Sequence, residues 1–258
     1  MSDDLGYNQD WDRLAFGFML VLARTAGAVT ALPGLGEAAA PARLRAALAL
    51  CLTALLLPGL LAALPPTPDT GARAGLMVVT EVVAGLWFGW MARLPMLALP
   101  MAGQLIAAFM GLSNVLQTGA DMGPQTTALA RLFEIAAPML ILATGAYALP
   151  LAALRALYDV IPAGGPLSAG DMGPAFVQTA ATSLALALSL AAPFVVAGLV
   201  WQTATGLMAR FLPRLQIYFV AVPGQLLGGL ILLAVLSDHL LTAFLQAMRD
   251  PLTVLPRG

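Results

Sequence analysis

The chain has 258 residues, of which 60% are hydrophobic and only 10% are charged, and its net charge is −1. Soluble domains carry about 25% charged residues, so this composition predicts an integral membrane protein and excludes the basic surface of a nucleic-acid-binding protein. One histidine, His239, and one cysteine, Cys51, exclude a histidine–cysteine metal cage or an internal disulfide. We therefore expect no metal site and no cofactor.

Apolar runs dominate the chain, and a helix of about 20 apolar residues crosses a bilayer. The longest stretch without a charge, residues 172–209, has 38 residues. These runs predict an all-α fold with about six long helices in one membrane domain, 1–258. In chain order the runs are 14–32, 44–64, a run that begins near 76, 129–157, 175–209 and 215–245.

Between the third and fourth runs, prolines and glycines such as Pro95, Pro100 and Gly111 interrupt the segment 94–128. Residues 101–112 are too apolar for a loop in water. Irregular backbone at membrane depth survives only when protein or a wet cavity surrounds it. The pattern favours a re-entrant segment, or one packed inside an assembly, over a long cytoplasmic loop.

Arginines between the runs predict the orientation, because cytoplasmic loops carry an excess of basic residues. Arg43 and Arg45 separate the first two runs, and Arg210 and Arg214 separate the last two. We expect both turns to face the cytoplasm, which puts the acidic N-terminus outside.

Charged residues inside membrane helices are costly and are candidate functional groups. The candidates in or near the runs are Arg24, Glu81, Arg93, Arg131, Glu134 and Asp238. Arg131 and Glu134 are three apart and can pair on one helix face. Structural pairing and snorkelling of arginine at the run ends are the first interpretation. Coupling groups of a transporter are the alternative. No hydrolase, metalloprotease or phosphate-binding motif occurs, so we expect no catalytic residue.

Four stretches in register resemble one family of bacterial export proteins. They are LARTAGAVTALPGLGEAAAPARLRAALAL at 22–50, EVVAGLWFGWMARL at 81–94, MAGQLIAAFMGLSN at 101–114 and GLMARFLPRLQIYFVAVPGQLLGGL at 206–230. Together they cover nearly the whole chain. The family that they resemble is that of the flagellar biosynthetic protein FliR and its counterpart in virulence type III secretion.

The resemblance implies a non-enzymatic subunit of the flagellar protein export gate in the inner membrane, at the base of the flagellum. One copy would assemble with several copies of FliP and FliQ, and also with FlhB and FlhA, to export unfolded polypeptides. Residues 1–172 would resemble a P subunit, with a pore plug at 106–125, and residues 173–258 a Q-like helical hairpin. The alternatives are a virulence-system subunit and a small secondary transporter that uses Glu81/Arg93 or Arg131/Glu134.

These interpretations give three groups of candidate residues. The buried polar group comprises Arg24, Glu81, Arg93, Arg131 and Glu134. The plug group comprises Gly103, Gln104, Ile106, Phe109, Met110, Gly111, Leu112, Asn114, Gly119 and Met122. The helix-packing and turn group comprises Gly206, Arg210, Pro213, Pro223 and Gly229.

Overall fold

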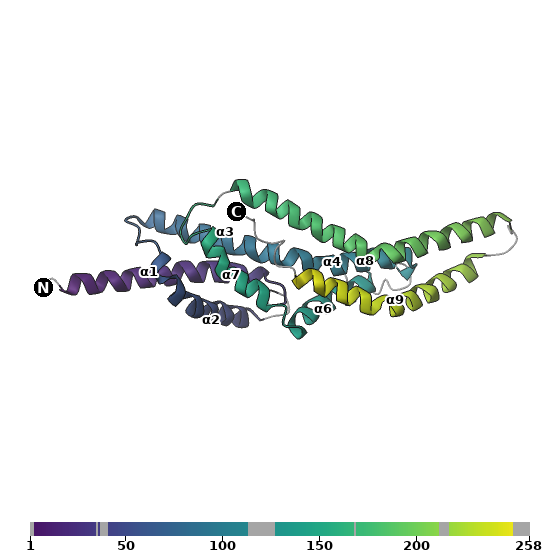
Figure 1. Ribbon diagram of the computed structural model, residues 1–258, viewed down its shortest axis with the longest axis horizontal. Coiled ribbons are helices and arrows are strands. Elements are labelled where there is room, and N and C mark those ends of the chain that lie inside the picture. The colour runs from purple at the N-terminus through teal and green to yellow at the C-terminus, as the bar shows by residue number, and fades with distance from the viewer. Residues whose placement is uncertain are drawn as a thin grey trace. The chain divides into compact units, whose positions relative to one another are not determined.

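The computed structural model describes residues 3–34, 36, 41–112, 127–167, 169–211 and 217–249, and no strand occurs within these ranges (Figure 1). The all-α prediction is therefore confirmed. The chain forms two compact units, one from Met1–Arg93, Gly145–Val177 and Pro251–Gly258 and the other from Leu94–Thr144 and Gln178–Asp250. We describe each unit separately.

The first unit contains three long helices and one shorter helix. Pro41 stands immediately before α2, where the missing proline N–H costs nothing, and Pro58 lies two residues before the last residue of that helix. The elements are α1 (Asp3–Ala31), α2 (Ala42–Leu60), a 3₁₀ turn (Leu61–Ala63), α3 (Gly71–Arg93) and α7 (Ala148–Val160), followed by the first residues of α8 (Ala169–Phe211).

Helices α1 and α3 approach so closely that glycines line the contact. A Cβ on Gly27 would lie 2.7 Å from the carbonyl oxygen of Val82, and a Cβ on Gly89 would lie 2.6 Å from that of Ala28. A Cβ on Gly85 would overlap the carbonyl oxygen of Arg24. Gly85 and Gly89 are four apart and so share one face of α3. Small residues at this spacing allow two helix backbones to meet.

The core of the first unit lies beside this contact. Its buried residues come from all four helices, and a helix contributes one face at a spacing of three and four residues. On α3 this face carries Glu81, Ala84, Gly85, Phe88, Gly89, Met91 and Ala92. A cluster of Ala28, Val29, Leu32, Ala49, Phe88, Ala92, Leu154, Leu157 and Ile161 joins α1, α2, α3 and α7.

The second unit begins with a 3₁₀ turn, Leu94–Leu97, that contains Pro95 and is followed by α4 (Ala98–Phe109). It continues with α6 (Ala128–Ala143), the part of α8 from Gln178, and α9 (Ile217–Arg249). The hydroxyl of Thr127 caps α6 by accepting from the backbone N–H of Ala130 at 3.2 Å. Pro95 lies in the 3₁₀ turn between α3 and α4, and Pro100 lies in the first turn of α4. Both positions agree with the predicted interruption of the apolar segment.

Among the described residues, five helical segments are long and apolar enough to cross a membrane, or up to six if the interrupted pair α6–α7 counts as one. The five correspond to five of the six predicted runs. The remaining run, 129–157, forms two helices, α6 and α7. Residues 144–147 form a turn in which Gly145 has a φ of 72°, a left-handed conformation that glycine adopts without steric cost.

Candidate functional site

The described end of the candidate plug segment, residues 106–112, lies against α8 and α9. Ile106 is fully buried, and Met110 and Leu112 are each 3% exposed. The α4 helix ends at Phe109, the backbone N–H of Met110 still bonds to the carbonyl of Ile106, and Gly111 then takes a φ of 72°. Glycine in the left-handed conformation just past the last turn is a common way to end a helix.

One side chain of α9 bonds to this helix end. Gln225 donates from Nε2 to the carbonyl oxygen of Phe109 at 2.8 Å. The last carbonyls of a helix have no partner within the helix, so the glutamine satisfies one of them. A Cβ on Gly111 would lie 3.4 Å from Cδ of the same glutamine. Gln225 therefore contacts both the end of α4 and the residue at which the chain changes direction.

Most of α8 and all of α9 fall in the predicted hairpin 173–258, and the two are called the hairpin helices below. One glycine of each makes room for the same residues. A Cβ on Gly198 of α8 would lie 2.7 Å from the carbonyl oxygen of Phe109. A Cβ on Gly229 of α9 would lie 3.0 Å from both Cβ and Cγ of Met110. A side chain at Gly198 would therefore displace the backbone of α4, and one at Gly229 would displace the side chain of Met110.

A cavity of about 240 Å³ adjoins these contacts. Its walls are almost entirely apolar, and Gln225 is the polar side chain among the described residues that line it. The lining comes from the end of α4 and the facing sides of both hairpin helices: Phe109, Met110, Phe194, Ala197, Gly198, Trp201, Gly224, Gln225, Gly228, Gly229 and Leu232.

The first unit contains a buried ion pair, Arg24 of α1 with Glu81 of α3. Arg24 Nε lies 2.6 Å from Glu81 Oε2, Arg24 Nη2 lies 3.0 Å from Oε1, and both side chains are at most 2% exposed. This two-point contact matches the planar fork of the guanidinium to the carboxylate. The sequence singled out both residues but did not pair them.

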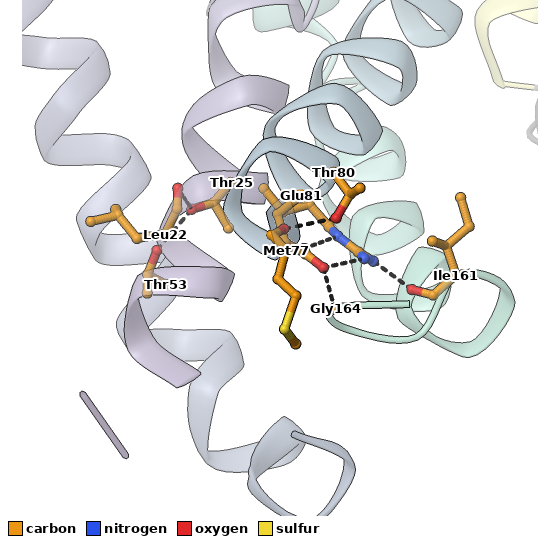
Figure 2. A network of polar contacts seen from close by, with 9 residues as sticks. Leu22, Thr25, Thr53, Met77, Thr80, Glu81, Ile161 and Gly164 are labelled. Atoms are coloured by element: carbon orange, nitrogen blue, oxygen red, sulfur yellow. Dashed lines mark hydrogen bonds and ion pairs between the residues drawn. The ribbon is translucent and has the colours of Figure 1, made fainter. Parts of the chain in front are cut away.

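The same pair also fixes the turn after α7. The remaining terminal nitrogen of Arg24, Nη1, donates to the carbonyl oxygen of Ile161 at 2.8 Å. Glu81 Oε1 also accepts from the backbone N–H of Gly164 at 2.6 Å (Figure 2). The guanidinium carbon lies 4.0 Å from the centre of the Tyr158 ring, a cation–π arrangement. The pair thus joins α1, α3 and the 161–164 turn.

The remaining candidate residues are not gathered into one site within the described ranges. Arg93 lies 6.0 Å from the ring centre of Trp90. Arg131 Nη1 lies 2.8 Å from Glu134 Oε2, with both side chains about half exposed.

Gly103 faces Phe133 and Ala130 of α6, and Gln104 is half-buried on α4. Arg210 is exposed in the last turn of α8, Pro223 lies inside α9, and a Cβ on Gly206 would meet no atom within 4 Å. Asn114, Gly119, Met122 and Pro213 lie outside the described residues.

Sequence reasoning missed Gln225 and Gly198 as contacts of α4. Gln225 carried a usable signal, because it is the single polar side chain between Phe219 and Leu236. A lone amide in an apolar helix requires a hydrogen-bond partner. The identity of that partner, 116 residues earlier in the chain, has no periodic signal in the sequence.

Comparisons with known proteins agree with the resemblance. The family model for bacterial export proteins, family 1, matches residues 15–250. The chain is 35% identical over 235 residues to the flagellar biosynthetic protein FliR of Caulobacter vibrioides, which covers 91% of this chain and 94% of that protein. It is 25% identical to FliR of Escherichia coli over 91% of this chain and 92% of that protein. It is 27% identical to the Yop proteins translocation protein T of Yersinia pestis, over 70% of this chain and 71% of that protein.

The family-model match, over residues 15–250, includes both the buried ion pair and the contact of α4 with α8 and α9. Together with the long apolar helices, the matches show that the chain is a helical membrane protein that belongs to the bacterial export proteins of family 1.

Proposed function

We propose that this chain is a non-enzymatic subunit of the flagellar type III protein export gate in the bacterial inner membrane. The observation that carries the proposal is the match to FliR of Caulobacter vibrioides, 35% identical over 94% of that protein. The match to the Yop translocation protein, 27% identical over 71% of that protein, is weaker and shorter. Similarity therefore favours the flagellar system over the virulence system.

The proposed partners are FliP and FliQ, with FlhB and FlhA, and one copy of this chain in the assembly. Exposed apolar side chains on the α8–α9 hairpin support a partnered state: Phe219, Val220 and Val235 are each more than 70% exposed. Such side chains require lipid or another protein to cover them. Gly206 and Gly229 would allow neighbouring helices to approach closely, although Gly229 already contacts Met110 within this chain.

Within the gate, we assign the pore plug to residues 106–125. Its described part, 106–112, is an apolar helix end that terminates at a glycine with positive φ and adjoins a cavity. A helix end held by a few contacts can leave its position at a cost of a few kcal/mol, which keeps an open state accessible. A plug needs this property, because it must exclude ions at rest and move aside for a polypeptide.

Deletion of residues 114–119 tests the plug assignment. We expect a complex that still assembles with FliP and FliQ but lets small ions cross the membrane in the absence of export. Co-purification of the three proteins measures assembly, and the conductance of the reconstituted complex in lipid vesicles measures the leak. An assembled deletion complex with unchanged conductance and normal export would contradict the assignment.

A small secondary transporter is less compatible with the geometry of Glu81. A coupling carboxylate must exchange its proton or ion during transport, whereas Glu81 already accepts from two nitrogens of Arg24 and from the backbone of Gly164. Purification distinguishes the two functions. A transporter would be stable alone or as a homodimer, and the proposed gate subunit would be stable only with its partners.

A further inference from the structure

We propose that Gln225 is a positioning residue that holds the end of α4, residues 106–112, against the α8–α9 hairpin. This inference rests on the proposed function in one respect: if 106–125 is the plug, Gln225 sets the balance between its closed and open positions. The contact itself, from Gln225 Nε2 to the carbonyl of Phe109 at 2.8 Å, is independent of that function.

The chemistry of the position requires a donor. The carbonyl of Phe109 is in the last turn of α4, where carbonyls have no partner within the helix, and the surrounding cavity wall is apolar. A carbonyl that is partly withdrawn from water costs free energy when it has no hydrogen-bond donor. The amide of Gln225, in an otherwise apolar part of α9, supplies that donor. Methionine has a similar length and flexibility but no N–H, so it isolates the hydrogen bond from the packing.

The glycines around the contact show why the amide reaches the helix end. Gly198 has no side chain opposite the Phe109 carbonyl, and Gly229 has none opposite Met110. The backbone of α4 therefore approaches α8 directly, and the side chain of Met110 packs against α9. Gly111, where a Cβ would contact the glutamine amide, has the positive φ at which the chain changes direction. The hydrogen bond thus connects α9 to the last residues before the change of direction.

The hydrogen bond is the one polar contact described between these hairpin helices and residues 106–112, beside a cavity of about 240 Å³. Because of this space, the end of α4 has fewer atoms in contact with it. Fewer van der Waals contacts are therefore lost when the end of α4 moves away from the hairpin helices. Loss of the Gln225 hydrogen bond then raises the population of the displaced state by roughly tenfold.

The experiment measures the exposure of position 112 in the assembled complex. Leu112 is 3% exposed, and Cys51 is the single cysteine of the chain. In a Cys51→Ser, Leu112→Cys background, a small membrane-permeant maleimide labels position 112 only when the helix end leaves the hairpin. We expect Gln225→Met to raise the labelling rate roughly tenfold. Gln246→Met is the matched control, because Gln246 lies exposed on the same helix, and it should leave the rate unchanged.

A second substitution tests the same contact from α8. Gly198→Ala places a Cβ 2.7 Å from the Phe109 carbonyl and should also accelerate labelling. Its control is Gly228→Ala, which lines the same cavity but whose Cβ would meet no atom within 4 Å. Equal effects of the two alanines would show that cavity volume, and not the contact with α4, controls the position of the helix end, and would overturn the inference.

Conductance of the same complexes in lipid vesicles separates this inference from the plug assignment. Faster labelling with a raised ion conductance supports both. Faster labelling with unchanged conductance supports Gln225 as the positioning residue and contradicts the plug assignment. An unchanged labelling rate in an assembled Gln225→Met complex overturns the inference, whatever the conductance of the 114–119 deletion.

Discussion

Helices α1 and α3 of the first unit and helix α9 of the second are all long and apolar, but they differ in what covers their surfaces within this chain. The α1–α3 contact places glycine against backbone and buries an arginine and a glutamate with several of their hydrogen-bonding atoms partnered. Helix α9 leaves Phe219, Val220 and Val235 more than 70% exposed. Among the described residues, its polar contact with α4 is the hydrogen bond from Gln225.

The difference indicates that apolar composition alone does not specify what a membrane helix contacts. Close helix contact in lipid depends on small residues and on paired polar groups, and α1–α3 has both within this chain. Helix α9 has small residues but few internal partners. Its surface is therefore suited to lipid or to other subunits. Substitutions can change the contacts of one of these surfaces while leaving those of the other unchanged.

The largest expected effect is on the buried ion pair. Glu81→Ala leaves the Arg24 guanidinium buried without its carboxylate and removes the acceptor of the Gly164 N–H. Loss of one partner of a buried pair costs about 3–5 kcal/mol. We expect the first unit to unfold at markedly lower temperature, measured by thermal denaturation of the purified complex.

Glu134→Ala is the control for that substitution. Glu134 pairs with Arg131, but the Glu134 side chain is 48% exposed, and exposed pairs contribute less than about 1 kcal/mol. Arg24→Met combined with Glu81→Met should recover much of the stability, because no charge is then left unpaired. A double variant as unstable as Glu81→Ala would show that the pair matters through its contacts with the 161–164 turn.

The next prediction compares Gly85, which lies at the α1–α3 contact, with Gly206 of α8, which has open space around it. Gly85→Leu introduces a side chain against the backbone carbonyl of Arg24, and overpacking of this kind costs about 1–3 kcal/mol or more. Gly206→Leu meets no atom within 4 Å. We expect Gly85→Leu to lower the thermal stability of the chain itself. Gly206→Leu should leave that stability unchanged and reduce co-purification with FliP and FliQ.

The smallest effect concerns a polar contact between α1 and α2. The hydroxyl oxygens of Thr25 and Thr53 lie 2.8 Å apart, and both residues are fully buried. Thr53→Val keeps the shape and removes one hydroxyl, which should cost about 1 kcal/mol. Thr203→Val on the exposed surface of α8 should cost less. Equal shifts in unfolding temperature would show that the buried hydroxyl pair adds nothing.

The sequence predicted the all-α class and five of the membrane-length helices, because long apolar runs have few alternative structures. It predicted that Arg131 and Glu134 could pair, since three residues on a helix bring two side chains together. It also indicated the interruption near Pro95, because proline leaves a backbone carbonyl of the preceding turn unpaired.

The tertiary contacts could not be predicted in the same way. Arg24 and Glu81 are 57 residues apart, and Phe109 and Gln225 are 116 apart. No helical period links such positions, so only the folded chain identifies the partners. The turn at Gly145 was missed for a local reason. A single glycine in an apolar run is compatible with a continuous helix, and its positive φ becomes visible only in the structure.

The exposed apolar surface of α9 also bears on how much of this protein a cell retains. A copy made in excess of its partners would present Phe219, Val220 and Val235 to the bilayer without a neighbouring subunit. Such orphan copies would differ from assembled ones in the exposure of this surface. Membrane proteases, which act on exposed and loosely packed segments, can therefore remove unassembled copies and leave assembled ones. The steady-state amount of this chain would then follow the supply of its partners rather than its own rate of synthesis.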